Sequence, residues 1–219
     1  AIGGTASAAN GYANANAYGI YNASGTVNLE KNVTITTSAM AKNGDAYAYA
    51  LHANGGTINI NQATGHPYTV KLTGDLLANG GIINLNLNNS SSFLRGNVIA
   101  NGVTINLTLT NNAVWQPVYD NRNGTFNNFS ANYSATKNTI RALNLSGGIV
   151  DLTWDNNKRT AYRTLNITDL SGTGGKIKIN TNLSGNTGDT LAAALSTGAN
   201  LGVAITYDPI MDTLSGVGY

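Results

Sequence analysis

Apolar and polar side chains alternate in short runs along this chain. In "TININ" at 57–61, Ile58 and Ile60 alternate with threonine and asparagine, and the same pattern recurs over 83–88 and 105–110. A period of two predicts β-strands that bury one face and expose the other to water. The segment nearest to a helical period is short and flanked by glycine. The pattern therefore predicts an all-β protein.

The alternating runs recur at regular intervals. Six of them end at Leu29, Ile60, Leu85, Leu107, Leu152 and Ile179. The intervals are 31, 25, 22, 45 and 27 residues, and the interval of 45 is close to two steps, so we expect a degenerate copy inside it. Periods of this length are typical of solenoids, propellers and arrays.

Asn-Gly dipeptides distinguish a coil from an antiparallel sandwich. They occur at Asn54, Asn79 and Asn101, each time just before the same kind of strand. Hairpin turns of a sandwich would recur every 8–12 residues, whereas these dipeptides mark one corner of a longer period. We therefore predict a right-handed parallel β-helix, a solenoid in which each turn lies on the turn before.

The last third of the chain changes in character, as the end of a solenoid would. Its strands are separated by longer, turn-rich connections, and Lys176 and Lys178 occupy outward positions of "GKIKIN", where lysine often protects a sheet edge. Val118–Thr139 has poor periodicity and predicts a long protruding turn. We predict one continuous elongated domain with coils over 1–139 and further coils with a C-terminal β-strand cap over 140–219.

The composition removes several classes of function. Charged residues make up 10% of the chain, while there are 34 Asn and 26 Thr. The net charge is +2, which gives no electrostatic reason to expect nucleic acid or an anionic membrane as a partner. With no cysteine, the chain can form neither disulfides nor cysteine–zinc sites.

The search for catalytic chemistry gives no candidate residues. His52 takes the place of Tyr21 in the repeat, so we expect a position on the coil surface, and His66 lies in a turn-like insert. The nearest group of carboxylates is Asp151 with Asp155, and Asp151 fits the outward polar slot of a repeat. We therefore predict no enzyme, no catalytic or metal-binding residues and no cofactor.

Aromatic residues gather in the early turns. Tyr18, Tyr21, Tyr47 and Tyr49 recur near one corner, and we expect them to stack between coils, as aromatic side chains do in sheets. The alternative is an adhesive stripe for a partner or glycan. Both tryptophans, Trp115 and Trp154, are expected to be core or turn anchors.

Three segments, taken in order, resemble a known family. They are "SSFLRGNVIANGVTINLTLTNNAVWQPV" (91–118), "IRALNLSGGIVDL" (140–152) and "YRTLNITDLSGTGGKIKINTNLSGNTGDTL" (162–191). Together they resemble the pertactin-like passenger of type V autotransporters. In that family a signal peptide and an outer-membrane barrel flank the passenger, and the segment similar to 140–206 is the autochaperone, which promotes folding of the β-helix.

The resemblance implies a non-enzymatic adhesin at the surface of a Gram-negative bacterium, anchored in the outer membrane or secreted. Such a passenger would act in adhesion, autoaggregation or biofilm formation, with a surface receptor, a glycan or a second copy in trans as its partner. Two alternatives stay open: a passive stalk for an upstream binding head, and a β-helical polysaccharide-degrading enzyme. The sequence identifies neither the receptor nor the ligand-binding residues.

Overall fold

The fold is a coil of stacked strands, seen here in a computed structural model that describes residues 2–8, 15–41, 46–63, 65–101, 103–117, 137–154, 162–182 and 187–207. These residues form twenty β-strands. The described part of the chain holds no helix long and apolar enough to cross a membrane. The predicted all-β class is confirmed.

The strands form three columns, and each turn of the coil adds one layer to each column. The first column contains β1 (Ile2–Ala8), β4 (Val33–Ala41), β7 (Val70–Thr73), β10 (Phe93–Arg95), β13 (Val114–Gln116), β15 (Ile149–Asp151), β17 (Thr173–Asn182) and β20 (Asn200–Tyr207). The second contains β2 (Ala15–Asn22), β5 (Ala46–Ala53), β8 (Asp75–Asn79) and β11 (Val98–Asn101). The third contains β3 (Thr26–Leu29), β6 (Thr57–Ile60), β9 (Ile82–Leu87) and β12 (Thr104–Thr110).

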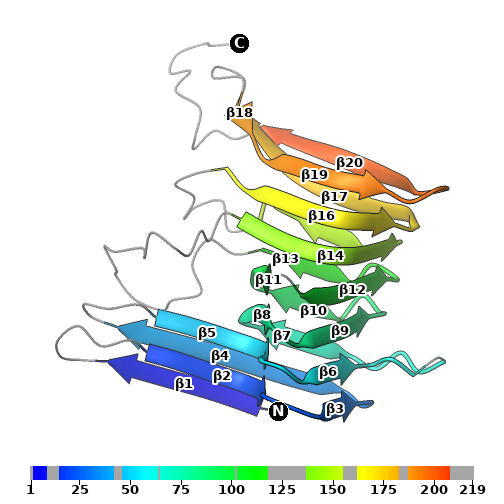
Figure 1. Ribbon diagram of the computed structural model, residues 1–219. Coiled ribbons are helices and arrows are strands. Elements are labelled where there is room, and N and C mark those ends of the chain that lie inside the picture. The colour runs from blue at the N-terminus through cyan, green and yellow to red at the C-terminus, as the bar shows by residue number, and fades with distance from the viewer. Residues whose placement is uncertain are drawn as a thin grey trace.

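The second and third columns merge in the later turns. There β14 (Lys137–Ser146) pairs with both β11 and β12, and it is followed by β16 (Thr164–Ser171) and β19 (Thr190–Leu195). Pairing inside every column is parallel; the short β18 (Thr187–Gly188) runs antiparallel to the end of β17. The stack rises from β1–β3 to β19 and β20 (Figure 1). This arrangement is the predicted parallel β-helix.

The third column corrects part of the predicted alignment of repeats. Its inward side chains stack in the order Leu29, Ile60, Leu85, Leu107, Leu143, Leu170 and Leu195. The first four were placed correctly. The runs ending at Leu152 and Ile179 belong instead to the first column, where Val150 lies between Trp115 and Ile177.

The wrong assignment has a physical cause. All three columns show the same alternation of period two, so the pattern alone does not tell one column from another. The copy predicted inside the long interval is β14, because Leu143 lies on Leu107 in register. A single turn holds the extra residues, most of which lie in the predicted protruding segment. Of that segment, 118–136 lies outside the described residues, and 137–139 belong to β14, so the prediction of a turn is wrong for these three residues.

The interior of the coil is apolar and fully closed along most of its length. Side chains such as Ile58, Leu85, Leu107 and Trp115 are at most 1% exposed. Burying one side chain of this size stabilises a fold by about 1.5–3 kcal/mol. Trp115 also donates a hydrogen bond from Nε1 to the carbonyl oxygen of Gly96 at 2.9 Å, so its one polar group is satisfied. The prediction of Trp115 as a core residue is confirmed.

The repeated Ala-Asn-Gly-Gly phrase is required by the corner between the second and third columns. Gly55 and Gly80 have φ values of 110° and 86°, which side chains with a Cβ rarely adopt. A Cβ on the next residue, Gly81, would lie 2.4 Å from the carbonyl oxygen of Gly56. At these two corners the first glycine provides a positive φ and the second leaves room for the preceding turn, whereas Val103 takes the place of Gly81 in the next turn.

The final turn exposes apolar side chains. Leu195, Val203 and Ile205 are 67%, 55% and 68% exposed, and in the described residues β19 and β20 each pair on one side only. The lysines were expected to protect this edge. They do point outward, but β17 lies between β15 and β20 and is not an edge strand. The prediction of an edge guard at Lys176 and Lys178 is therefore wrong.

Candidate interaction surface

An asparagine ladder runs along the outer face of the third column. Asn59 Nδ2 donates to Asn28 Oδ1, Asn84 Nδ2 to Asn59 Oδ1, and Asn106 Nδ2 to Asn84 Oδ1, each at 2.7 Å. The ladder forms because in-register parallel strands place identical side chains one strand spacing apart. It ends at β14, where Ala142 follows Asn106 in register. The outer face of these four turns is thus polar without being charged.

A second, shorter amide row follows the corner described above. Asn79 Nδ2 donates to Asn54 Oδ1 at 3.4 Å, and Asn54 Nδ2 donates to the Tyr21 hydroxyl at 2.8 Å. Asn101 continues the row in register with Asn79. The three Asn-Gly sites therefore occupy one corner of the coil, as predicted. At its lower end the row meets an aromatic cluster.

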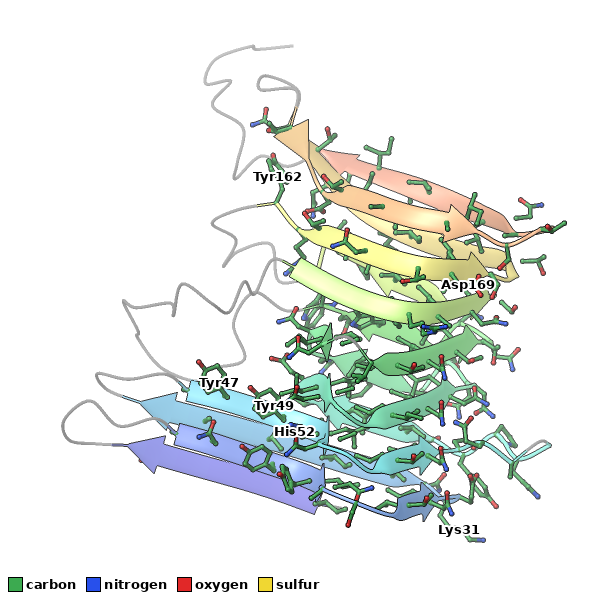
Figure 2. The ribbon with its side chains drawn as sticks, in the orientation of Figure 1. Lys31, Tyr47, Tyr49, His52, Tyr162 and Asp169 are labelled. Carbon is green, nitrogen blue, oxygen red and sulfur yellow. The ribbon has the colours of Figure 1, made fainter. Side chains whose placement is uncertain are left out.

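The aromatic cluster covers the outer face of β2 and β5. Tyr18 stacks on Tyr49 with ring centroids 5.6 Å apart, and Tyr21 meets His52 edge to face at 5.0 Å. Tyr47 stacks on Tyr49 at 6.0 Å. Figure 2 shows Tyr47, Tyr49 and His52 in sequence along β5. Stacking between coils, the predicted role of these tyrosines, is confirmed.

Small residues beneath the cluster explain how it is supported. Ala15, Ala17, Ala39, Ala46 and Ala48 form a separate buried group. Because their side chains are short, the two columns can lie close together in these broad first turns, where β1, β2, β4 and β5 extend beyond the rest of the stack (Figure 1). The tyrosines on the opposite face of the same strands therefore lie on a closely packed base.

Burial perturbs two titratable groups in the cluster. His52 is on the outer face, but the surrounding tyrosines leave it only 9% exposed, so the expectation of an open surface position needs correcting. Its two ring nitrogens have no hydrogen-bond partner in the described part of the chain, and burial lowers the pKa of the imidazole. Burial, followed by the charge of Asp75, raises the pKa of the Tyr49 hydroxyl. Both rings therefore pack as neutral groups near pH 7.

The C-terminal coils contain a buried polar cluster that the sequence did not identify as a unit. Asp189 Oδ1 accepts the backbone N–H of Arg163 at 2.8 Å. Its Oδ2 accepts the backbone N–H and the Nδ2 of Asn180 at 2.7 and 3.0 Å. Arg163 is fully buried, and its Nη1 donates to the carbonyl oxygens of Leu152 and Trp154. The cluster ties the connection between β15 and β16 to the connection between β17 and β19, one turn later.

The remaining candidate residues show no catalytic grouping. Asp151 forms an ion pair with Lys178 at 3.1 Å and accepts a hydrogen bond from the Thr153 hydroxyl at 2.6 Å. It faces outward as expected, but on the first column and not in the asparagine ladder. Asp155 lies outside the described residues. Within the described ranges, no three His, Asp or Glu side chains gather in a way that could hold a metal ion.

The second histidine and the second tryptophan lie in turns. His66 is in the segment between β6 and β7 and stacks on Tyr68 at 5.4 Å, so the expectation of a turn is confirmed. Trp154 follows β15 in a turn and is 37% exposed. The Arg95 guanidinium lies 4.9 Å from its ring centroid, which is a cation–π distance. Trp154 is therefore a turn anchor and not a core residue.

The comparisons with known proteins agree with the fold. The family model described as Pertactin matches residues 140–208, which is 69 of the 219 residues. A comparison with curated proteins and one with solved structures gave no match. The matched segment contains most of β14, all of β15–β20 and all three members of the buried cluster at Arg163, Asn180 and Asp189. The chain therefore carries a pertactin-like autotransporter passenger segment, built as a parallel β-helix.

Proposed function

We propose that this chain is a non-enzymatic adhesive passenger at the surface of a Gram-negative bacterium, where it acts in adhesion, autoaggregation or biofilm formation. The observation that supports this proposal is the outer face of the first turns. Its asparagine ladder offers neutral donors and acceptors at regular spacing. Its aromatic cluster adds Tyr18 and Tyr21, which are 38% and 48% exposed.

A surface of this kind suits many weak contacts better than one strong contact. Side-chain amides and tyrosine hydroxyls exchange hydrogen bonds with water at little net cost. Repetition along the coil then raises the overall strength, because each contact increases the effective concentration of the next. The partner would be a receptor or glycan on a host or bacterial surface, or a second copy of the chain on a facing cell.

The C-terminal coils have a second proposed role, which is to promote folding of the coils that precede them. The buried cluster around Asp189 supports this role, because its combination of an aspartate, an arginine and an asparagine is not repeated in the neighbouring turns and so favours one register. Buried polar groups are best attested as devices that fix register. A correctly registered end would then serve as the template on which earlier turns pair.

Cell display tests the adhesive role. The full-length parent protein is displayed on a non-clumping cell with and without residues 1–219, at surface levels matched by antibody staining. We expect the deletion to abolish autoaggregation and attachment. If attachment persists, the chain is a passive stalk and an upstream head carries the binding. If neither form attaches or aggregates, the adhesive role itself is wrong.

A further inference from the structure

A groove lined by residues without carboxylate, ammonium or guanidinium groups lies halfway along the coil, beside the segment that joins β6 to β7. The segment extends away from the stack after β6 (Figure 1), and its residues 62–63 and 65–67 form one wall of a hollow beside β9 and β12. The hollow between wall and face has a volume of about 370 Å³, within the range of small-molecule sites. It is lined by Gln62, Ala63, Gly65, His66, Pro67, Asn86, Asn88, Thr108, Thr110 and Asn111.

The wall of the groove is held in place by side chains from neighbouring turns. Asn88 Nδ2 donates to the carbonyl oxygen of His66, and Asn89 Nδ2 to those of Pro67 and Tyr68, all at 3.1 Å. On the other side, the Glu30 carboxylate accepts the backbone N–H groups of residues 62 and 63 at 3.0 Å. A segment fixed in this way loses little conformational entropy when it binds a ligand.

The floor of the groove repeats the chemistry of the outer face. Asn86 and Thr108 are neighbours in register on β9 and β12, and Asn88 and Thr110 lie two residues further along. Hydroxyls and amides therefore stand in rows one strand spacing apart. Asn111 closes the far end; its φ of 52° turns the chain, and its Nδ2 donates to the carbonyl oxygen of Asn88 at 3.0 Å.

The lining chemistry selects the class of ligand. None of the ten lining residues carries a carboxylate, an ammonium or a guanidinium group. A charged ligand would lose its hydration here and gain no partner of opposite charge. A neutral ligand rich in hydroxyl groups can instead pair with the amides and hydroxyls of the floor, while the ring faces of His66 and Pro67 cover its C–H face.

From this geometry we infer that the groove is a binding site for a neutral carbohydrate. The inference gives a ligand class and a location to the adhesive role proposed above, and so rests on it. The ligand would lie across β9 and β12, with its hydroxyls on Asn86, Thr108 and Thr110 and residues 62–63 and 65–67 along one side. The aromatic cluster near the first turn is a separate surface and is not required for this binding.

The test uses the purified chain of residues 1–219 and three neutral oligosaccharides: maltohexaose, cellohexaose and N-acetylchitohexaose. Binding is measured by calorimetry and by saturation-transfer NMR. The main variant is Thr108→Lys, which places a long charged side chain in the groove. The matched control is Thr104→Lys on the same outward face of β12, because Thr104 does not line the groove. Thermal unfolding confirms that both variants are folded.

We expect at least one of the three sugars to bind the unaltered chain. Thr108→Lys should weaken that binding by about tenfold or more, and Thr104→Lys by less than about twofold. Pro67→Gly, which removes a ring face from the wall, gives a second check and should weaken binding severalfold. The inference is overturned if no neutral sugar binds, if both lysine variants bind equally, or if a sulfated heparin hexasaccharide is preferred.

Displaying the same variants on cells separates this inference from the adhesive role. If deletion of 1–219 abolishes attachment but Thr108→Lys leaves it unchanged, the groove is not the adhesive site and the adhesive role stands. If the purified chain binds sugar through the groove but deletion leaves attachment unchanged, the carbohydrate site stands and the adhesive role falls.

Discussion

The first turns and the last turns of this coil are held together by different kinds of contact. From β2 to β12 the contacts repeat: asparagine on asparagine, tyrosine on tyrosine, leucine or isoleucine on leucine. From β14 to β20 many polar contacts occur only once, such as the buried cluster of Arg163, Asn180 and Asp189 and the ion pair of Asp151 with Lys178.

The difference matters because repeated contacts specify register weakly. An asparagine ladder shifted by two residues, or by a whole turn, can still find amide partners, and a slipped strand is a known hazard of repetitive sheets. The Asp189 carboxylate accepts three N–H groups from two different turns, and it can do so in one register only. The comparison suggests that the last turns define the register and the first turns copy it. Four predictions test this difference, in order of expected effect.

The largest effect is expected in the unique cluster. Asp189→Ala removes the acceptor for three N–H groups, at Arg163 and Asn180, in a buried region. Unpaired buried donors cost about 1–3 kcal/mol each, so the free energy of unfolding should fall by about 4 kcal/mol in urea titrations. Asp169→Ala, which removes a carboxylate bonded to Ser196 on the surface, should cost less than about 0.5 kcal/mol. Equal losses of unfolding free energy would show that the buried cluster stabilises the fold no more than a surface carboxylate does.

The second effect is expected in the apolar core of the third column, where each substitution leaves a cavity in one turn. Leu85→Ala empties a site that is 1% exposed and should cost about 3 kcal/mol. Leu107→Ala, one turn later in the same column, should cost a similar amount. Leu195→Ala in the last turn, where the side chain is 67% exposed, should cost less than about 1 kcal/mol. A large cost at Leu195 would mean that this end is covered in solution.

The asparagine ladder should contribute less per residue. Asn84→Ala removes one donor and one acceptor from a half-buried row. We expect a loss of about 1 kcal/mol in the free energy of unfolding. Asn16→Ala, at an exposed position of β2, serves as the matched asparagine control. It should change the free energy of unfolding by less than about 0.5 kcal/mol. A neutral result at Asn84 would assign the ladder to surface recognition alone.

The smallest effect is a dependence on pH. Burial lowers the folded-state pKa of His52, so between that pKa and the ordinary value of about 6.5 the unfolded chain binds more protons. The stabilisation is therefore complete above about pH 6.5 and is lost as pH falls through the folded-state pKa. His52→Phe keeps an aromatic ring beside Tyr18 and Tyr21, and its stability should decline less than that of the unaltered chain between about pH 7 and pH 5. Identical pH profiles would contradict a buried neutral His52.

Much of the fold follows from local pattern. The alternation in "TININ" and "IINLNL" determines which face is buried, and the glycines after Asn54 and Asn79 mark a corner with positive φ and close approach of successive turns. Both features depend on a few neighbouring residues, so both could be predicted from the sequence alone.

Contacts between turns were harder to predict. Leu152 was placed in the wrong column because columns share one alternation, and only the pairing of Trp115 with Val150 separates them. The sequence predicts an edge position for Lys178, whereas in the structure its side chain pairs with Asp151, which lies 27 positions earlier in the chain. Charged residues make up only 10% of the chain. An arginine and an aspartate in the last third, Arg163 and Asp189, are therefore the one feature of the sequence that could have indicated the buried cluster.

Pulsed hydrogen exchange during refolding of the full chain tests the central claim most directly. The claim is that the last turns acquire their register first and the earlier turns pair onto them. Backbone amides of β14, β16, β17 and β19 should become protected before those of β2, β5, β6 and β9, and Asp189→Ala should delay both groups. Protection that begins in the first turns, or a delay confined to the last turns, would contradict the account.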